Sequence, residues 1–484
     1  MNNLDRSNVT IVGGGPAGLG VALMLAQRGW TGITVLEKRH TANYYEPDKS
    51  FSYQIDGRGQ KLTDLVSLTT KLADLSVLST DFYFTLIQKS GKRQTRKLPI
   101  ADPNRKPGYW LPRAALMELL YQEIDRDWRS VIEILFNTEC VEIQQHPEHL
   151  EVITQSSERG QLTFSPKLLI GCDGLNSIVR QTLTNIEERS YSFEMQQFPS
   201  PSSGLKYKVL TLPAQFPLSE RAGDLSQSTM AYGIRSIFKK RKKAISLGLL
   251  PFKNPEQPRT ANIITYSDSE IWQLKTPAEV EQFLKQAFPQ IPLDKIITPA
   301  EIARFTFSKG GTFPIPQYCS GLTQLYGKSH PDSTGTAVIL LGDAAHCFPP
   351  DIGQGVNSAL EDIYIFHNIL AETCDDLDRS LPIYQDIRQP DIQALVRLVQ
   401  VSYPWQYNQD PLQNKIWGVN FLIRLGLSRL LPFVFSPHSI MLIQNHELSY
   451  SEILAKSDRT TQLLSILGGA IALILIIIYR NIRF

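Results

Sequence analysis

The sequence predicts an α/β fold in which a split, doubly wound domain with a parallel sheet carries an inserted β-sheet domain and a C-terminal helical region with a membrane helix. Three observations support this prediction. A glycine-rich turn follows a short apolar strand near the N-terminus, and apolar strands that lead into acidic residues recur near residues 170 and 340. The third observation is an uncharged apolar stretch close to the C-terminus.

Length and charge exclude several classes of protein. A chain of 484 residues is too long for one layered core, so we expect two or three domains. Its 49 Lys and Arg residues nearly balance 47 Asp and Glu residues, and this balance argues against nucleic acid as the main partner. The five cysteines are far apart and form no Cys-x-x-Cys pair, so neither a disulfide framework nor a metal site is predicted.

The first motif predicts a dinucleotide site. Residues 8–13 form a strand, the Gly-x-Gly-x-x-Gly turn opens a helix over 17–28, and a second strand over 32–36 leads into an acidic residue. Glycines let the backbone approach a pyrophosphate at the positive end of the helix, and the acidic side chain can accept hydrogen bonds from a ribose. The candidate residues are Gly13, Gly15, Ala17, Gly18, Glu37, Lys38 and Arg39.

Two later motifs favour FAD over NAD as the bound cofactor. A strand at 168–171 precedes Asp173-Gly174, and a strand at 338–341 leads into Gly342-Asp343. A carboxylate after a strand can hold the ribityl hydroxyls of a flavin, and the helix that follows can turn free N–H groups toward the flavin ring. The candidates are Asp173, Asp343, Gly353, Gly355, Val356 and Asn357.

The order GGGPAGLG, GCDGLNSIVR and GDAAHCFPPDIGQGVNSALED resembles the single-component FAD-dependent aromatic hydroxylases, the class A flavin monooxygenases, over residues 8–400. The resemblance implies that NADPH or NADH reduces bound FAD and that O2 adds at flavin C4a. The resulting hydroperoxide would then hydroxylate a small aromatic substrate. It also implies that Pro350 lies close to the flavin ring, as a catalytic residue, and that Arg113 lies near the flavin and its phosphates.

Within the family, the segment 56–59 and the tail over 437–452 resemble kynurenine 3-monooxygenases. The chain departs from them at residues 81–85, where a Gly-Arg pair usually holds the substrate carboxylate, and at 437–439, where a Tyr precedes the Met. The likeness therefore implies the reaction type more firmly than the substrate. Arg58 is a candidate catalytic residue that either binds an acidic substrate or forms a salt bridge within the fold.

The C-terminal residues 463–479 contain no charge and span about 26 Å as a helix, which predicts a single-pass membrane anchor with the catalytic part on the cytoplasmic side. The organelle stays open. Upstream, residues 416–443 are apolar but interrupted by Arg424, Arg429 and prolines. This segment either lies along the membrane interface or packs on the enzyme as an ordinary amphipathic helix.

These motifs suggest a division into an FAD-binding domain at 1–190 and 331–400, an inserted β-rich substrate domain at 191–330, a helical or interfacial region at 401–460 and an anchor at 461–484. Strands are expected at 206–212, 230–238, 244–250 and 261–266, with the basic run 239–243 as a solvated hairpin turn.

The function predicted from these features is that of a membrane-anchored FAD monooxygenase that hydroxylates a kynurenine-like aromatic substrate with NAD(P)H and O2. One alternative is a flavoenzyme that hydroxylates, epoxidises or reduces a lipophilic substrate such as a prenyl lipid or quinone. A flavin-binding scaffold without turnover is a minor alternative. The oligomeric state stays open.

Overall fold

The structure is a computed structural model that describes residues 6–42, 46, 51–80, 83–97, 105–186, 192–327, 335–408 and 410–482. Asp81 and Phe82, where the sequence departs from the kynurenine enzymes, lie outside the described residues.

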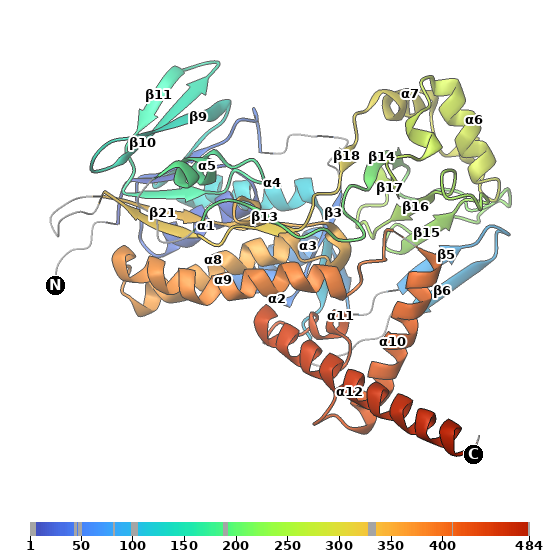
Figure 1. Ribbon diagram of the computed structural model, residues 1–484. Coiled ribbons are helices and arrows are strands. Elements are labelled where there is room, and N and C mark those ends of the chain that lie inside the picture. Colours follow the sequence, from blue (N-terminus) through green and yellow to red (C-terminus); the bar gives the residue numbers. More distant parts are fainter. Residues whose placement is uncertain are drawn as a thin grey trace.

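A six-stranded sheet forms the centre of the larger domain, in the order β20-β21-β12-β1-β2-β8 (Figure 1). Its strands are parallel except β20, which pairs antiparallel to β21 at one edge. The order places β12 and β21, from distant parts of the sequence, beside β1, as the three motifs predict. The strands are β1 (Val9–Val12), β2 (Ile33–Leu36), β8 (Ile132–Leu135), β12 (Leu168–Gly171), β20 (Thr323–Tyr326) and β21 (Thr336–Leu340).

Helices cover one face of this sheet, and a three-stranded antiparallel sheet lies on its other side (Figure 1). All four residues of β1 and of β12 are buried, as expected for parallel strands covered on both faces. The elements around the sheet are α1 (Pro16–Gln27), α2 (Gly57–Leu65), α3 (Thr69–Leu75), α4 (Arg113–Glu123), α5 (Ile178–Asn185), α8 (Gly355–Glu372), α9 (Leu377–Val401), β9 (Thr138–Gln145), β10 (Leu150–Ser156) and β11 (Gly160–Phe164).

The second domain is built on a seven-stranded sheet with its own hydrophobic core, and this arrangement confirms the predicted fold class. The four strands expected here are present, as β14 (Lys206–Leu212), β15 (Ala231–Arg235), β16 (Ser246–Leu249) and β17 (Arg259–Thr265). Helices α6 (Pro277–Ala287) and α7 (Pro299–Phe307) and the short β18 (Gly311–Thr312) complete the inserted segment.

Two strands of this sheet come from the N-terminal part of the chain, which the sequence did not reveal. β5 (Tyr83–Ile87) pairs parallel to β15, and β6 (Arg93–Lys97) forms the edge of the sheet. β6 is mostly exposed and contains no apolar residue, so it lacks the pattern that identifies a buried strand. The chain therefore passes between the two domains more than once, because β5 and β6 precede the inserted segment yet belong to its sheet.

A small sheet links the domains, with the order β3-β7-β4. Its strands are β3 (Ser52–Ile55), β7 (Gly108–Pro112) and β4 (Val77–Ser79), and α2 follows β3 directly. A second small sheet joins β13 (Gln196–Gln197), β19 (Gln317–Tyr318) and β22 (His346–Cys347). These sheets fix where the inserted segment leaves and re-enters the larger domain.

The C-terminal region is helical, with α10 (Pro411–Leu430), the short α11 (Ser439–Leu442) and α12 (Tyr450–Ile482). The predicted division at 460/461 falls inside α12, because this helix begins well before its uncharged part. The first half of α12 packs along α9, and the second half extends away from the body of the protein (Figure 1). Residues 450–479 of α12 form a helix that is long and apolar enough to cross a membrane.

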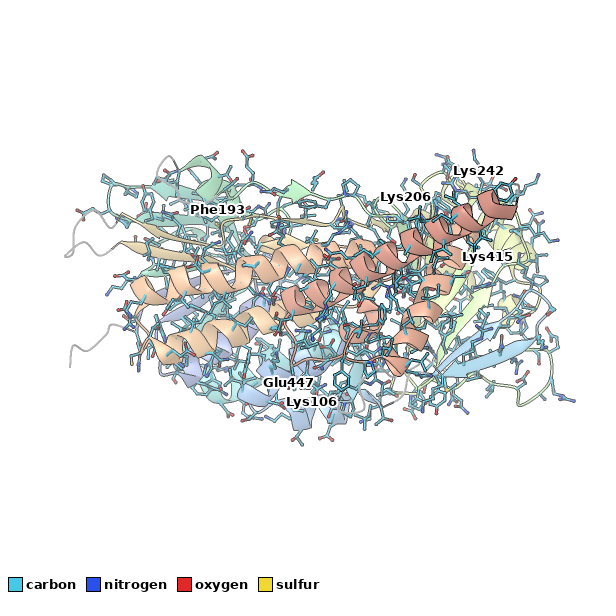
Figure 2. All side chains as sticks on the ribbon, turned by 60° about the horizontal axis from the view of Figure 1, so that its bottom comes forward. Lys106, Phe193, Lys206, Lys242, Lys415 and Glu447 are labelled. Carbon is cyan, nitrogen blue, oxygen red and sulfur yellow. The ribbon has the colours of Figure 1, made fainter. Side chains whose placement is uncertain are left out.

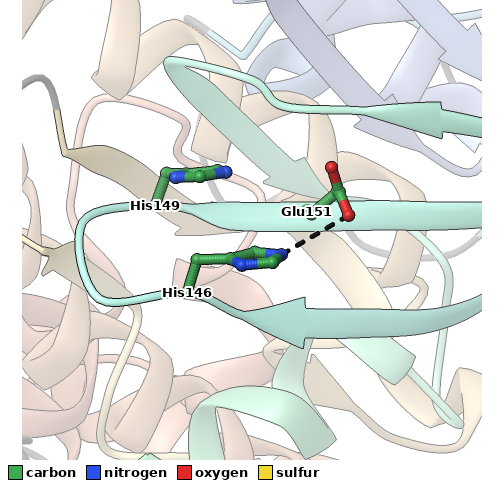
Figure 3. Close-up of side chains that lie close together, drawn as sticks. All are labelled: His146, His149 and Glu151. Atoms are coloured by element: carbon green, nitrogen blue, oxygen red, sulfur yellow. Dashed lines mark ion pairs between the residues drawn. The ribbon is translucent and has the colours of Figure 1, made fainter.

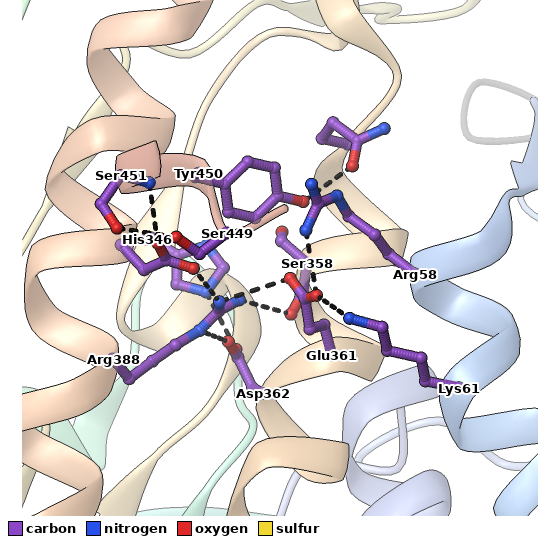
Figure 4. Close-up of polar contacts among 12 residues, drawn as sticks. Arg58, Lys61, His346, Ser358, Glu361, Asp362, Arg388, Ser449, Tyr450 and Ser451 are labelled. Atoms are coloured by element: carbon purple, nitrogen blue, oxygen red, sulfur yellow. Dashed lines mark hydrogen bonds and ion pairs between the residues drawn. The ribbon is translucent and has the colours of Figure 1, made fainter. Parts of the chain in front are cut away.

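A buried group of charges joins α8, α9, α2 and the start of α12 (Figure 4). The Arg388 guanidinium is fully buried and contacts Asp362 at 2.7 Å, Asp391 at 3.1 Å and Glu361 at 3.4 Å. Glu361 also accepts from Arg58, at 3.1 Å. These charges compensate one another, and each side chain holds two elements together.

We predict that Arg388→Met lowers the free energy of unfolding by about 3–5 kcal/mol, because it leaves buried carboxylates without their cation. The measurement is the thermal unfolding midpoint in detergent. Arg397→Met, on an exposed position of the same helix, is the matched control. Equal midpoints for the two variants would show that the buried charges do not stabilise the fold.

Candidate active site

The glycine-rich turn between β1 and α1 is shaped by contacts that exclude side chains. Gly13 has φ of +103°, and a Cβ there would lie 2.4 Å from the Cys172 carbonyl oxygen. A Cβ on Gly18 would lie 1.9 Å from the Gly13 carbonyl oxygen. Gly15 differs, because a Cβ would meet no atom within 4 Å. The turn is therefore packed on its inner side and open at Gly15.

The acidic residue after β2 is held by the same turn. Glu37 is buried, and its carboxylate accepts from the backbone N–H groups of Gly14 at 3.0 Å and Arg39 at 2.8 Å. The side chain of Arg39 pairs with Glu46, at 2.7 Å. Lys38 is exposed and lies 3.8 Å from Glu139. Glu37 thus has the predicted position, while Lys38 points away toward solvent.

The second motif lies against the first. The Asp173 Oδ2 atom accepts from the Ile178 N–H group at 2.7 Å, which orients the carboxylate at the start of α5. Its Oδ1 atom is buried and has no hydrogen-bond partner in the described structure. Burial raises the pKa of Asp173, although bonds from Ser177 and from backbone N–H groups oppose the shift. The carboxylate keeps one oxygen free for a ligand.

The third motif contributes a carboxylate that faces an opening. The Asp343 side chain is exposed to solvent, yet desolvation by the surrounding protein raises its pKa, against opposing interactions with His346 and Arg113. The Asp343 carboxylate is therefore accessible to a ligand just after β21. Arg113, at the first position of α4, also hydrogen-bonds Tyr53 and lowers the pKa of that phenol, which burial raises.

The turn before α8 is also open. Gly353 has φ of +64°, and a Cβ at Gly353 or Gly355 would meet no atom within 4 Å. Val356 is half-buried beside them. The side chain at the N-cap of α8 makes no capping bond, so backbone N–H groups of its first turn stay available. A Cβ on Gly342 would lie 3.5 Å from the Ala17 Cβ, so the third motif contacts the first.

The side chain of Asn357 is bonded within the protein. Its side chain accepts from the Asp56 N–H group at 3.0 Å and donates to the carbonyls of Gln54 at 2.8 Å and Gly353 at 3.0 Å. These bonds fasten the β3–α2 connection to the start of α8. The amide side chain is therefore fully used within the protein, and only its backbone can face a cofactor.

The two predicted catalytic residues lie in contrasting surroundings. Pro350 is exposed and begins the short helical turn that leads into Gly353. Arg58 is 1% exposed, and its guanidinium donates to Glu361 and to the carbonyls of Asn445 and Leu448. It also lies over the Tyr450 ring, 4.2 Å from the centroid. Of the two interpretations of Arg58, these contacts favour pairing within the fold.

Two residues of the third motif were not proposed as site residues from the sequence. The buried Asp351 accepts from the Ser202 hydroxyl at 2.5 Å, and burial raises the pKa of its carboxyl to about 7. Gln354 donates to Asp56 and accepts from the Tyr450 hydroxyl, each at 2.7 Å. Asp351 and Gln354 lie inside the third motif, but nothing in their spacing shows that they are buried and paired.

His346 is likewise buried, with Nε2 2.9 Å from Asp362. It therefore packs behind the site, as its motif position suggests.

A group of possible metal ligands lies elsewhere, on the β9–β10 hairpin (Figure 3). His146 and His149 stack with ring centroids 4.7 Å apart and planes at 9°, and Glu151 lies 3.4 Å from His146. This group was not predicted from the sequence. Parallel rings direct their lone pairs side by side, so the arrangement does not converge on one ion.

The site fits FAD by three observations. The turns at Gly15, Gly353 and Gly355 are open, the Asp173 Oδ1 atom is unpaired, and the Asp343 carboxylate is exposed. N–H groups at two helix starts suit a pyrophosphate and an electron-rich ring, and the carboxylates suit hydroxyl groups.

Comparison with known proteins agrees with this geometry. The model of the FAD binding domain family matches residues 6–199 and 333–399, which are the two parts that flank the inserted segment. The chain belongs to this family.

The chain is 26% identical to the kynurenine 3-monooxygenase of Dictyostelium discoideum, over 76% of this chain and 71% of that protein. It is 23% identical to the kynurenine 3-monooxygenase of Caenorhabditis elegans, over 95% and 94%. Among solved structures, P. aeruginosa PqsL in complex with 2-aminobenzoylacetate matches with a TM-score of 0.56 and 19% identity, over 85% and 99%.

The fold and the site thus define an FAD-dependent monooxygenase, which uses NADPH or NADH as the electron donor. More particularly, it is an aromatic monooxygenase similar to the kynurenine 3-monooxygenases. The predicted family, enzyme class and cofactors are confirmed.

We predict that Gly15→Val gives a folded protein without FAD. The backbone at Gly15 has φ of −78°, which any residue adopts, and the new side chain meets no protein atom. It would instead occupy the open side of the turn. The measurements are the flavin absorbance and the unfolding midpoint after purification. Gly18→Val is the contrasting variant, because its side chain would collide with the backbone and prevent folding. A normal flavin spectrum for Gly15→Val would contradict the assignment.

We predict that Asp351 makes stability depend on pH. Because its pKa is about 7 in the folded protein and about 3.9 in the unfolded chain, the folded state binds more protons between these values. The free energy of unfolding therefore falls as pH rises from about 4 to about 7, and this contribution is lost above pH 7.

Asp351→Asn, which imitates the protonated form, should remove this part of the pH dependence. The measurement is the unfolding midpoint from about pH 5 to about pH 8. Asp268→Asn, at an exposed surface position, is the control and should follow the unmodified protein. The same slope in all three proteins would contradict the prediction.

Proposed function

We propose that this protein is a membrane-anchored FAD monooxygenase that hydroxylates a kynurenine-like aromatic substrate. The observation that carries the proposal is that the three motifs contact one another and keep open glycines, in a chain that is similar to kynurenine 3-monooxygenases over nearly its full length. α12 would provide the anchor.

The residues that would hold FAD come from all three motifs. The turn at Gly13, Gly15 and Gly18 would receive the pyrophosphate, and Glu37 the ribose. Asp343 and Asp173 would accept hydroxyl groups, with Arg113 supplying positive charge. The N–H groups of Gly355, Val356 and Asn357 would face the ring. Bound FAD supplies the redox chemistry, by accepting electrons from NAD(P)H and activating O2.

The protein's own task is to position the substrate and to exclude water. Pro350 and Gly353 are exposed in the turn before α8. The Phe51 and Tyr53 rings pack edge to face with centroids 5.6 Å apart, and Tyr53 interacts with Arg113 and Asp343. Burial raises the pKa of Tyr53, so this wall stays neutral at physiological pH. A neutral aromatic wall suits an aromatic substrate and keeps bulk water out.

Arg58, His438 and Ser439 offer little positive charge to a substrate carboxylate. Both terminal nitrogens of the Arg58 guanidinium are bonded within the fold. Burial beside Arg424 lowers the pKa of His438 to about 4, so this imidazole is neutral at physiological pH. Ser439, in the stretch 437–439 where this chain departs from the related enzymes, is uncharged and accepts from the Ser402 hydroxyl at 2.9 Å. These features support a broader aromatic substrate class, of which kynurenine is the first member to test.

The orientation in the membrane is part of the same proposal. All five cysteines are free, including the exposed Cys374, which supports a catalytic part that faces the reducing cytoplasm. The apolar α12 also allows the second candidate function, in which a prenyl lipid or quinone enters from the bilayer.

The test is NADPH-dependent reduction of the bound flavin under anaerobic conditions, followed by absorbance in detergent. We predict that L-kynurenine accelerates reduction, and that the aerobic reaction then yields a hydroxylated product by mass spectrometry. A lipid extract is added in a parallel reaction. Acceleration by the extract alone would favour the lipid or quinone enzyme. A protein that holds FAD but is not reduced by NADPH or NADH would contradict both functions.

A further inference from the structure

α10 has its apolar side turned outward. The exposed residues of this helix form an almost entirely apolar face, which we call the outer face of α10 and which consists of Leu412, Ile416, Val419, Leu422, Ile423 and Leu430. The turn that follows continues it, because Phe433 is 95% exposed and Leu431 and Val434 are also exposed. An amphipathic helix on a soluble surface has the opposite orientation.

The polar and aromatic side of α10 is the one that faces the protein. The Arg424 side chain is buried and donates to the Ser457 carbonyl at 3.2 Å and the Thr461 hydroxyl at 2.7 Å, both on α12. Trp417 packs on Tyr403, with ring centroids 4.3 Å apart, and donates to the Ser402 carbonyl at 2.8 Å. These contacts fix the rotation of the helix, so its apolar side cannot turn inward.

The charges of α10 indicate what could cover the outer face. The helix contains Lys415, Arg424 and Arg429 and no acidic residue. Lys415 and Arg429 are exposed and lie toward its two ends. A second copy of the chain in a symmetric pairing would bring these cations together, whereas phospholipid headgroups would neutralise them.

The outer face is also continuous with an apolar surface. α10 is bound to α12 at Thr461, directly before the uncharged and exposed stretch from Leu463 to Tyr479. The two helices lie together at one face of the molecule (Figures 1 and 2). A bilayer that receives the second half of α12 therefore begins next to α10.

We propose that the outer face of α10 and the turn at Phe433 are a second membrane-contacting surface, which lies in one leaflet beside the anchor. The occupant is phospholipid. This inference rests on the proposed anchoring by α12 and adds that the protein is held at the bilayer by two elements. With Arg424 joining them, the rotation of the enzyme body relative to the membrane is fixed.

The experiment uses the full chain in vesicles of phosphatidylcholine and phosphatidylserine that contain a phospholipid with a photoactivatable diazirine in its acyl chain. After illumination, adducts are located by mass spectrometry of peptides. We expect adducts in residues 411–434 as well as in 463–479.

The double variant Ile416→Glu/Ile423→Glu should reduce adducts in 411–434 by about tenfold or more, because charged groups are costly in the acyl region, while those in 463–479 persist. Val141→Glu/Leu225→Glu, at two exposed apolar positions outside this surface, is the matched control and should change neither.

Four other results would contradict the proposed membrane contact of α10. Adducts in 463–479 alone would overturn this inference and leave the anchor intact, and adducts in neither segment would overturn both. Cross-links between α10 helices of two chains, in place of lipid adducts, would assign the outer face to a dimer. Labelling in 411–434 that is unchanged by the glutamates would show that contact does not depend on the outer face.

Discussion

The buried guanidinium of Arg388 is neutralised by the carboxylates of Asp362, Glu361 and Asp391. Much of the site depends on these buried ion pairs. Asp362 also accepts from the Gly342 N–H group at 2.8 Å and lies 2.9 Å from His346, so it holds the motif that presents Asp343. Glu361 binds Arg58 from α2, and Asp391 accepts from the Ser451 N–H group at 2.8 Å. One buried cation thus connects the flavin motif, the N-terminal segment and the start of α12.

The same region links the cofactor turn to the C-terminal helix. Tyr450 lies between Arg58 and Arg388, and its hydroxyl donates to Gln354 inside the open turn before α8. Gln354 in turn donates to Asp56, whose backbone N–H group is bonded to Asn357. The proposed anchor therefore begins in contact with the proposed cofactor site. Membrane attachment and flavin binding share side chains at one end of α12.

Much of the larger domain could be predicted because its signals are local. The β1–α1 turn, the strands before Asp173 and Asp343, and four strands of the inserted sheet follow from periodicity and from glycine spacing. β6 could not be found, since an edge strand without apolar residues has no pattern. The two interpretations of residues 416–443 could not be separated either, because a sequence shows that a helix is amphipathic but not which side faces the protein.

The sequence by itself determined the class of the protein, since the glycines, the strand-end carboxylates and the order of the motifs are local requirements for binding a dinucleotide. The tertiary structure decided which polar groups stay free. It leaves the Asp173 Oδ1 atom unpaired and the Asp343 carboxylate exposed, and it bonds the side chains of Arg58 and Asn357 to partners distant in sequence. The physical reason is that an unpaired polar group costs free energy when it is buried, so most buried polar side chains are paired, and packing between elements rather than sequence neighbours decides the partner.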